Sequence, residues 1–271
     1  MEYQIINPSR FLSPYVKHYW MLENCLPEGQ KHVQRIIPNG LTELIFYLGD
    51  KPHSNESMRC FSENSIISGQ LNTYYDLEVT GKMSLLSIIF QPHGLSAFFD
   101  IPVNELLNQN IPLKFLYKEG LDALEDKLFE ASNFKEKIRI VEQFLFECLK
   151  NKTADYHFNR ISNSIFLINR SKGLIEIDTL AEASCFSRKQ FERTFSMLVG
   201  ISPKQFLKTV RFQNALHVKA ENQHRNLSEL TYLCGYYDQS HMISEFFRFS
   251  GLTPKQYFAE CEPYSDYFGK V

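Results

Sequence analysis

A stretch in the C-terminal half of this sequence is rich in cationic side chains. Between Ser187 and Arg211 it holds six lysines and arginines and one acidic residue, Glu192. Local positive charge attracts phosphate groups, although the whole chain, with a formal net charge of −2, does not by itself indicate a nucleic-acid partner. An arginine can also bond O6 and N7 of guanine, and a glutamate can accept from the amine of cytosine. The stretch therefore either reads DNA or forms an ordinary solvated helix face.

The candidate side chains fall on one face of a helix predicted at about residues 188–199. Phe191, Phe195 and Leu198 recur at helical spacing and predict the opposite, buried face. The remaining face carries Arg188, Lys189, Glu192, Arg193 and Ser196. We expect Arg193 to read a base. For Glu192, base reading and a solvent contact stay open as alternatives.

This helix belongs to a pattern that occurs twice in the chain. The sequences GISPKQF (200–206) and GLTPKQY (251–257) are near-copies, 51 residues apart. In each, the glycine suits the left-handed end of one helix, and a hydroxyl residue before proline suits the capped start of the next. A short helix and a tight turn precede each copy. The repeated unit is thus a helix-turn-helix followed by a capped exit helix.

The second copy predicts a second helix of the same kind at about residues 239–250, with Asp238 as its N-cap. Its solvent face is expected to present Gln239, Ser240, His241, Ser244 and Glu245. From Ser228 to Glu260 there are two basic residues against four acidic ones. We therefore expect this helix to contribute less to DNA affinity than the first one.

Residues from about 160 to 262 resemble the DNA-binding domain of the AraC/XylS family of bacterial transcription regulators. The resemblance rests on LAEASCFSRKQFERTFSMLVGISPKQFLKTVRFQNA and LSELTYLCGYYDQSHMISEFFRFSGLTPKQYF. It implies that the two helices enter adjacent major grooves of double-stranded DNA. The exit helix from Pro203 to about Ala220 supports this geometry, because it would be about 27 Å long, against a groove repeat of about 34 Å.

Four further cations are assigned to phosphate or to the interface between the repeated units: Lys204, Lys208, Arg211 and Arg248. Arg211 lies where the family has an arginine in the exit helix. We expect it to pair with a carboxylate near that interface, with a phosphate contact as the alternative. The chain departs from the family in the second unit, where Ser244 and Phe247 stand in places that often hold arginine or lysine.

The first part of the chain predicts β-strands and then helices. Runs rich in Ile, Val, Tyr, Phe and Thr alternate with turn residues up to about residue 90, and helical spacing begins at Gly94. A helix predicted over Phe134–Lys152 has an apolar stripe that is covered either by its own domain or by another subunit. The fold class is therefore α+β. We expect a β-barrel or sandwich with trailing helices at residues 1–155, then an all-α domain at 156–271 with two helix-turn-helix motifs joined by a linker helix.

Residues 15–23, 35–50 and 90–113 resemble an N-terminal domain found on a subset of these regulators. That resemblance implies a cupin-like barrel that senses a small molecule or pairs with a second chain. The aromatic residues expected to line a ligand pocket, unless they simply fill the barrel, are Trp20, Phe46, Tyr74 and Phe90, together with Tyr47 and Tyr75. The histidines at 18, 32, 53 and 93 lack metal-ligand spacing, so we expect no metal and no cofactor.

These patterns predict a sequence-specific transcription regulator, an activator, and not an enzyme. A DNA-repair alkyl transferase fused to such a domain is one alternative, but no GxSxG, P-loop or HExxH motif is present. A regulator controlled only by its own abundance, with the N-terminal part used for pairing, is another. The expected partners are double-stranded DNA, RNA polymerase, a small-molecule effector and a second copy. No apolar run reaches the roughly 18 residues of a membrane span, and a cytoplasmic location is expected.

Overall fold

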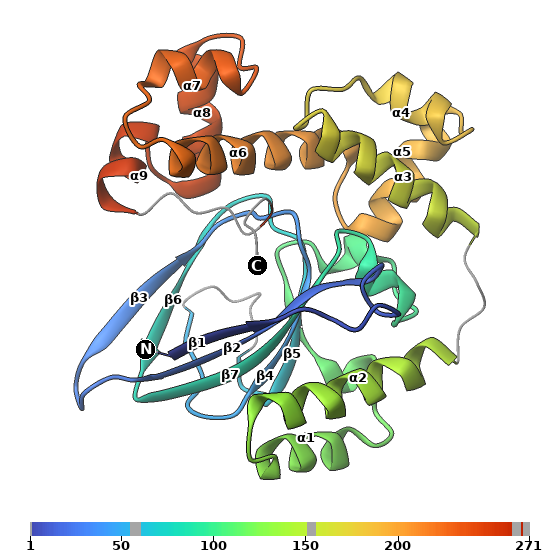
Figure 1. The fold of residues 1–271 in the computed structure, drawn as a ribbon, viewed down its shortest axis with the longest axis vertical. Helices are drawn as coiled ribbons and strands as arrows, with labels where there is room; N and C mark the ends of the chain where they lie inside the picture. Colours follow the sequence, from blue (N-terminus) through green and yellow to red (C-terminus); the bar gives the residue numbers. More distant parts are fainter. Residues whose placement is uncertain (1, 55–60, 151–155, 262–266, 268–271) are drawn as a thin grey trace.

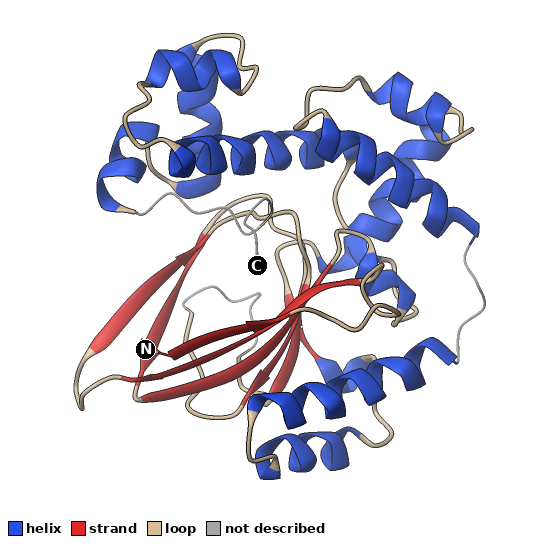
Figure 2. Cartoon of the chain, in the orientation of Figure 1, coloured by secondary structure: helices blue, strands red, loops and turns tan. Residues whose placement is uncertain are grey.

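The computed structural model describes residues 2–54, 61–150, 156–261 and 267. Its strands all lie in the N-terminal half, up to residue 150, and the C-terminal half, from Tyr156 onward, is helical (Figures 1 and 2). This arrangement confirms the predicted α+β class. The expected domain boundary at residues 155 and 156 adjoins residues 151–155, which lie outside the described residues.

The strands of the described residues form two antiparallel sheets. The larger sheet has the order β1-β2-β7-β4-β5-β8, and a separate ribbon pairs β3 with β6. The bounds are β1 (Glu2–Ile6), β2 (Val16–Cys25), β3 (Lys31–Ile36), β4 (Glu43–Tyr47), β5 (Ser65–Ser68), β6 (Tyr75–Thr80), β7 (Lys82–Phe90) and β8 (Asn110–Pro112). Strands β3 to β7 correspond to runs predicted from the sequence.

Both faces of the larger sheet are covered by apolar side chains. One face packs against α1 (Leu121–Glu130) and α2 (Phe134–Lys150) through Tyr19, Leu44, Phe46, Leu86, Ile88 and Phe90. The other face packs toward the ribbon, where Trp20, Leu22, Ile45, Tyr47 and Leu85 of the sheet lie in one cluster with Tyr75 and Val79 of β6. Two-sided burial explains the nearly continuous apolar sequence of β7, since neither set of alternating side chains faces water.

Helical turns and α2 complete the N-terminal half. The segment from Gly94 forms the 3₁₀ helices η1 (Gly94–Ala97), η2 (Val103–Leu106) and η3 (Leu113–Phe115) before α1 begins. The apolar stripe of α2, with Val141 and Leu145 fully buried, lies in the core of its own half. Of the two predicted alternatives, coverage by its own domain therefore holds for this stripe.

The C-terminal half contains two helical pairs at either end of one long helix (Figure 1). The helices are α3 (Tyr156–Arg170), α4 (Ile177–Ala183), α5 (Arg188–Val199), α6 (Pro203–Glu221), α7 (Leu227–Leu233), α8 (Gln239–Ser250) and α9 (Pro254–Glu260). Within the described ranges, no helix is long and apolar enough to cross a membrane.

The ends of α5 and α8 follow the local signals in the sequence. The Ser187 hydroxyl accepts from the Gln190 amide at 3.3 Å, and the Asp238 carboxylate accepts from the His241 amide at 2.7 Å. Each helix stops at a left-handed glycine, Gly200 with φ 99° or Gly251 with φ 71°. The helices predicted at 188–199 and 239–250 are therefore confirmed. Each begins where it does because the cap satisfies an amide that the start of a helix leaves unbonded.

The long helix α6 belongs to two separate cores. Phe206 and Val210 pack with α3, α4 and α5, whereas Phe212 and Leu216 pack with α7, α8 and α9. The helix has 19 residues, which corresponds to about 28 Å at 1.5 Å per residue. It therefore joins two helix-turn-helix units, which we name the first unit (α4 and α5) and the second unit (α7 and α8).

Candidate nucleic-acid interface

The two units are built alike. In each, the chain passes through a left-handed residue after the short helix, Cys185 with φ 51° or Gly235 with φ 66°. The next residue, Phe186 or Tyr236, turns inward and is buried. This inward aromatic ring anchors the turn, so that the following helix begins at the protein surface.

Helix α5 has the two faces that its sequence predicts. Phe191 and Phe195 are fully buried, and Leu198 is nearly so. Arg188, Lys189 and Arg193 are exposed, whereas Glu192 and Ser196 are half-buried. The Ser196 hydroxyl donates to the Glu192 carbonyl at 2.7 Å, so it is already used within the helix.

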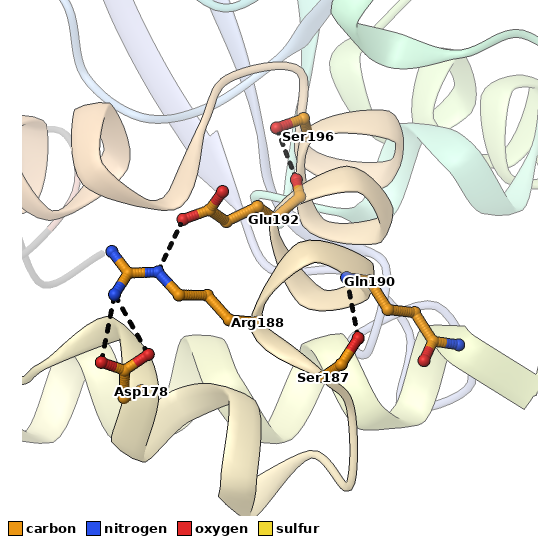
Figure 3. A network of polar contacts seen from close by, with 6 residues as sticks. All are labelled: Asp178, Ser187, Arg188, Gln190, Glu192 and Ser196. Atoms are coloured by element: carbon orange, nitrogen blue, oxygen red, sulfur yellow. Dashed lines mark hydrogen bonds and ion pairs between the residues drawn. The ribbon is translucent and has the colours of Figure 1, made fainter.

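Arg188 is held by two carboxylates (Figure 3). Its guanidinium lies 3.1 Å from Asp178 of α4 and 3.3 Å from Glu192, one turn along α5. Hydrogen bonding to Glu192 and the charge of Asp178 raise the pKa of Arg188 above its ordinary value. Base reading by Glu192 would require it to exchange this arginine for a cytosine amine.

Lys189 and Arg193 differ from Arg188, because neither has an ionic partner among the described residues. Both are exposed, and they lie four positions apart on α5. Residues at this spacing are neighbours on one helix face. These two cations are therefore available to phosphates or base edges without breaking an existing pair.

The second unit presents mostly uncharged groups. Gln239, Ser240 and Ser244 are exposed, and the Gln239 amide donates to the Ser228 hydroxyl at 2.8 Å. His241 is half-buried, with its ring 5.5 Å from that of Tyr236 in an edge-on arrangement. This surface offers hydrogen-bonding groups and little positive charge.

Glu245 corrects one expectation. Its charge predicts a place on the solvent face of α8, but only 4% of the residue is exposed. It accepts from Arg211 of α6 at 2.7 and 3.3 Å. The carboxylate is thus neutralised inside the protein and does not repel DNA, so the charge difference between the two units is smaller than the sequence count suggests.

Of the two roles predicted for Arg211, pairing with a carboxylate or contacting a phosphate, the structure shows the pairing. It pairs with Glu245, and its guanidinium lies 4.8 Å from the centre of the Tyr236 ring. Burial alone would lower the pKa of Arg211, but the hydrogen bond and charge of Glu245 raise it above the ordinary value. This pair ties α8 of the second unit to the long helix α6.

The remaining predicted cations lie at separate places. Lys204 is exposed in the first turn of α6, and Lys208 is half-buried one turn later. Arg248 is exposed in the last turn of α8. Lys204 and Lys208 thus follow the first unit, while Arg248 lies at the end of α8 that faces the N-terminal half.

Both α5 and α8 turn their C-terminal ends toward the N-terminal half. Gly200 packs against Gln70 and Val103, and Gly251 packs against Tyr74. The opposite ends, which start at Arg188 and Gln239, therefore point away from the N-terminal half and carry the exposed polar side chains. A helix that enters a major groove does so with its N-terminal residues first.

The four residues predicted to line one ligand pocket do not share a pocket. Phe46 and Phe90, with 1% and 0% exposure, lie in the core beneath α1 and α2. Trp20 lies on the opposite face of the sheet, where its indole donates to Glu43 at 3.1 Å. Tyr74 packs against the second unit. The expectation fails because the sheet is buried on both faces, so aromatic residues of neighbouring strands point to different layers.

The N-terminal histidines divide into two groups. His18 and His93 are buried, and His32 and His53 are exposed. Among the residues that the structure describes, no three His, Cys, Asp or Glu side chains gather in a group able to hold a metal ion.

Comparison with known proteins assigns the helical region. Residues 180–260 match a family described as a helix-turn-helix domain, and residues 4–112 match a domain of unknown function, DUF6597. The C-terminal half carries an AraC-type DNA-binding domain. The match covers both units of this AraC-type domain, together with the α6 helix that joins them.

Relatives are similar over part of their length. An uncharacterized HTH-type transcriptional regulator of Haemophilus influenzae is 28% identical over 118 residues, which is 44% of this chain and 37% of that protein. Probable transcriptional regulator LumQ of Photobacterium leiognathi is 24% identical over 190 residues, 69% of this chain and 62% of LumQ. The chain thus spans less than two thirds of either relative.

Among solved structures, ToxT from Vibrio cholerae O395 aligns with a TM-score of 0.45 at 12% identity. The alignment covers 85% of this chain and 96% of ToxT.

Proposed function

We propose that this chain is a sequence-specific transcription regulator whose helices α5 and α8 enter adjacent major grooves of double-stranded DNA. The observation that carries the proposal is the pair of capped helices at the two ends of α6, both with their N-terminal ends directed away from the N-terminal half. The length of α6, about 28 Å, is close to the groove repeat of about 34 Å.

Within this proposal some side chains contact bases, and others contact phosphate or hold the helices in place. Arg193 reads a base, Lys189 contacts phosphate, and Arg188 exchanges its carboxylates for DNA on binding. Gln239, Ser240, His241 and Ser244 read the second groove through neutral hydrogen bonds. Lys204 and Lys208 contribute phosphate contacts. Arg248, at the end of α8 that faces the N-terminal half, is assigned to the interface, and Arg211 acts through its hold on α8.

The N-terminal half completes the regulator. We assign residues 1–155 to effector binding or pairing with a second copy, and residues 156–271 to DNA. Activation through RNA polymerase and a cytoplasmic location follow from the regulator class and belong to the same proposal, as does the absence of an enzymatic role. A screen of small metabolites tests the effector role, since a ligand that binds only the folded chain raises its melting temperature.

The reading roles predict unequal losses of affinity. On a DNA site selected by the full chain, Arg193→Ala is expected to weaken binding by about 1–3 kcal/mol and to relax preference at one base position. Gln239→Ala is expected to weaken binding less, because it removes a neutral group that already bonds Ser228. Titration by fluorescence anisotropy at several salt concentrations measures both affinity and salt slope.

Arg139→Ala is the matched control, because this exposed arginine of α2 lies in the N-terminal half. It should leave affinity and salt slope unchanged. A larger loss from Gln239→Ala than from Arg193→Ala would reverse the assignment of the two units. Failure of the wild-type chain to select any sequence would remove the DNA proposal itself.

A further inference from the structure

One loop of the N-terminal half contacts both DNA-reading units at equivalent points. This is the β5–β6 loop (residues 69–74). A Cβ atom at Gly200 would lie 3.0 Å from Cγ of Gln70, and one at Gly251 would lie 2.6 Å from the Tyr74 hydroxyl. These glycines occupy the same position of the repeat, directly after α5 and α8. The loop therefore spans from the end of one reading helix to the end of the other.

The Tyr74 end of the loop is reinforced by Arg35. The Arg35 guanidinium bonds both oxygens of Asp76 at 2.8 and 2.9 Å and lies 4.6 Å from the centre of the Tyr74 ring. It also donates to the Ser250 carbonyl at 3.0 Å. The last carbonyls of a helix lack partners within the helix and favour a nearby cation. The N-terminal half thus supplies the cap for the C-terminal end of α8.

The Gln70 end of the loop is held just as firmly. Gln70 is fully buried, and its amide donates to the Gly40 carbonyl at 2.9 Å. Val103 of η2 packs on the same glycine of the first unit, with Cγ1 3.0 Å from a Cβ at Gly200. Between these ends, Gln213 of α6 donates to the Pro38 carbonyl at 2.8 Å. The AraC-type domain therefore contacts the N-terminal half near Gly200, at Gln213 and near Gly251.

The two units need such a link because they do not share a core. Their apolar clusters meet α6 on consecutive stretches, at Phe206 and Val210 for the first unit and at Phe212 and Leu216 for the second. The two ends of the C-terminal half also touch where Leu174, in the connection between α3 and α4, lies beside Gly235 in the turn of the second unit. Within the C-terminal half, the far ends of α5 and α8 are linked through α6, and a single helix bends. The β5–β6 loop ties those far ends together.

We propose that the β5–β6 loop sets the distance and angle between α5 and α8, so that Gln70 and Tyr74 are positioning residues for DNA recognition. The proposal rests on the function proposed above. The partner it specifies is a duplex with two half-sites at one fixed spacing. A change of one base pair rotates a half-site by about 34° about the DNA axis, so a rigid pair of helices rejects neighbouring spacings.

The test uses the full chain and a set of duplexes. Each duplex carries the two half-sites selected by the wild type, moved apart or together by one to three base pairs. The variants are Tyr74→Ala, which removes the ring over Gly251, Tyr74→Phe, which retains it, and Arg35→Met, which removes the bond to Ser250. Phe115→Ala is the control, because Phe115 is an exposed aromatic residue of η3.

For the wild type, Tyr74→Phe and Phe115→Ala, we expect binding to peak at one spacing. For Tyr74→Ala and Arg35→Met, the ratio between the best spacing and its neighbours should fall by about fivefold, in the range of coupling effects in proteins. A purely structural role would lower affinity at every spacing and leave that ratio unchanged. Circular dichroism identifies any variant that fails to fold, and the other variant then decides.

The outcomes separate the two proposals. An unchanged spacing profile in folded Tyr74→Ala or Arg35→Met overturns the positioning role of the β5–β6 loop and leaves the proposed DNA-binding function intact. An equally broad profile in Phe115→Ala also overturns it, because the effect would not depend on contact with α8. Absence of any selected site for the wild type overturns both.

Discussion

Replacing Arg211 by methionine is expected to lower the free energy of unfolding by about 3–5 kcal/mol, the usual effect of leaving one partner of a buried ion pair alone. The stranded group is Glu245, whose side chain is 3% exposed, against 14% for Arg211. Its carboxylate would lose both hydrogen bonds to Arg211 and remain buried, with the ring nitrogen Nε2 of His241 3.4 Å away. Urea unfolding followed by circular dichroism measures the change.

The double variant Arg211→Met/Glu245→Leu distinguishes loss of the pair from loss of packing. Two apolar side chains of similar volume need no hydrogen bonds, so most of the lost stability should return. Arg188→Ala is the matched control, because it breaks the exposed pairs with Asp178 and Glu192 and should leave the midpoint nearly unchanged. An Arg211→Met protein as stable as the wild type would show that the pair does not hold α8 to α6.

Helices α5 and α8 could be predicted from the sequence because their signals are local. A cap such as Ser187, a left-handed glycine such as Gly200 and phenylalanines four residues apart act within one or two turns. None of these depends on which other segment lies nearby. The bounds of α5 and α8 therefore followed from the residues themselves.

The misplacement of Glu245 has a different origin. Met242, Glu245, Phe246 and Phe249 follow the spacing of a buried helix stripe, so periodicity alone places Glu245 inward. Its charge favoured the solvent face instead. To assign Glu245 to the buried face, one must know that Arg211, 34 residues earlier, lies opposite it. Arg211 was expected to find a carboxylate, but the sequence did not identify which one.

The ligand-pocket prediction failed because both faces of the larger sheet are buried. In a strand, neighbouring side chains point to opposite faces, but a sheet buried on both faces offers aromatic residues to each. The sequence therefore does not tell whether Trp20 and Phe46 share a side. Tyr74 lies against Gly251, far along the chain, and no local pattern predicts a contact between the two halves.

The second prediction concerns the stability of the folded chain at low pH. His93 is 3% exposed, its two ring nitrogens have no hydrogen-bond partner among the described residues, and its ring lies 4.2 Å from that of Phe158 in α3. Burial lowers the pKa of His93 to about 4 from an ordinary value of 6.5. Burial and the charge of Lys17 likewise lower the pKa of His18 to about 4.

The sign of the pH dependence follows from the direction of the His93 shift. Below pH 6.5 the unfolded chain binds a proton that the folded chain refuses, so stability is complete above this pH and falls as the pH drops toward 4. At 1.36 kcal/mol per unit, His93 should remove about 2 kcal/mol by pH 5 and about 3 kcal/mol in all. Protonation requires opening the contact between the start of η1, where His93 lies, and α3, so acid should separate the two halves there.

Replacing His93 by phenylalanine keeps a ring on Phe158 and removes the titrating group. The slope of unfolding free energy between pH 6.5 and 4.5 should flatten by about 1 kcal/mol per pH unit relative to the wild type. His224→Gln, at an exposed histidine, should leave the slope unchanged. Equal slopes for His93→Phe and the wild type would show that His93 is protonated as readily in the folded chain as in the unfolded one. The neutral imidazole between the start of η1 and α3 would then make no contribution to acid sensitivity.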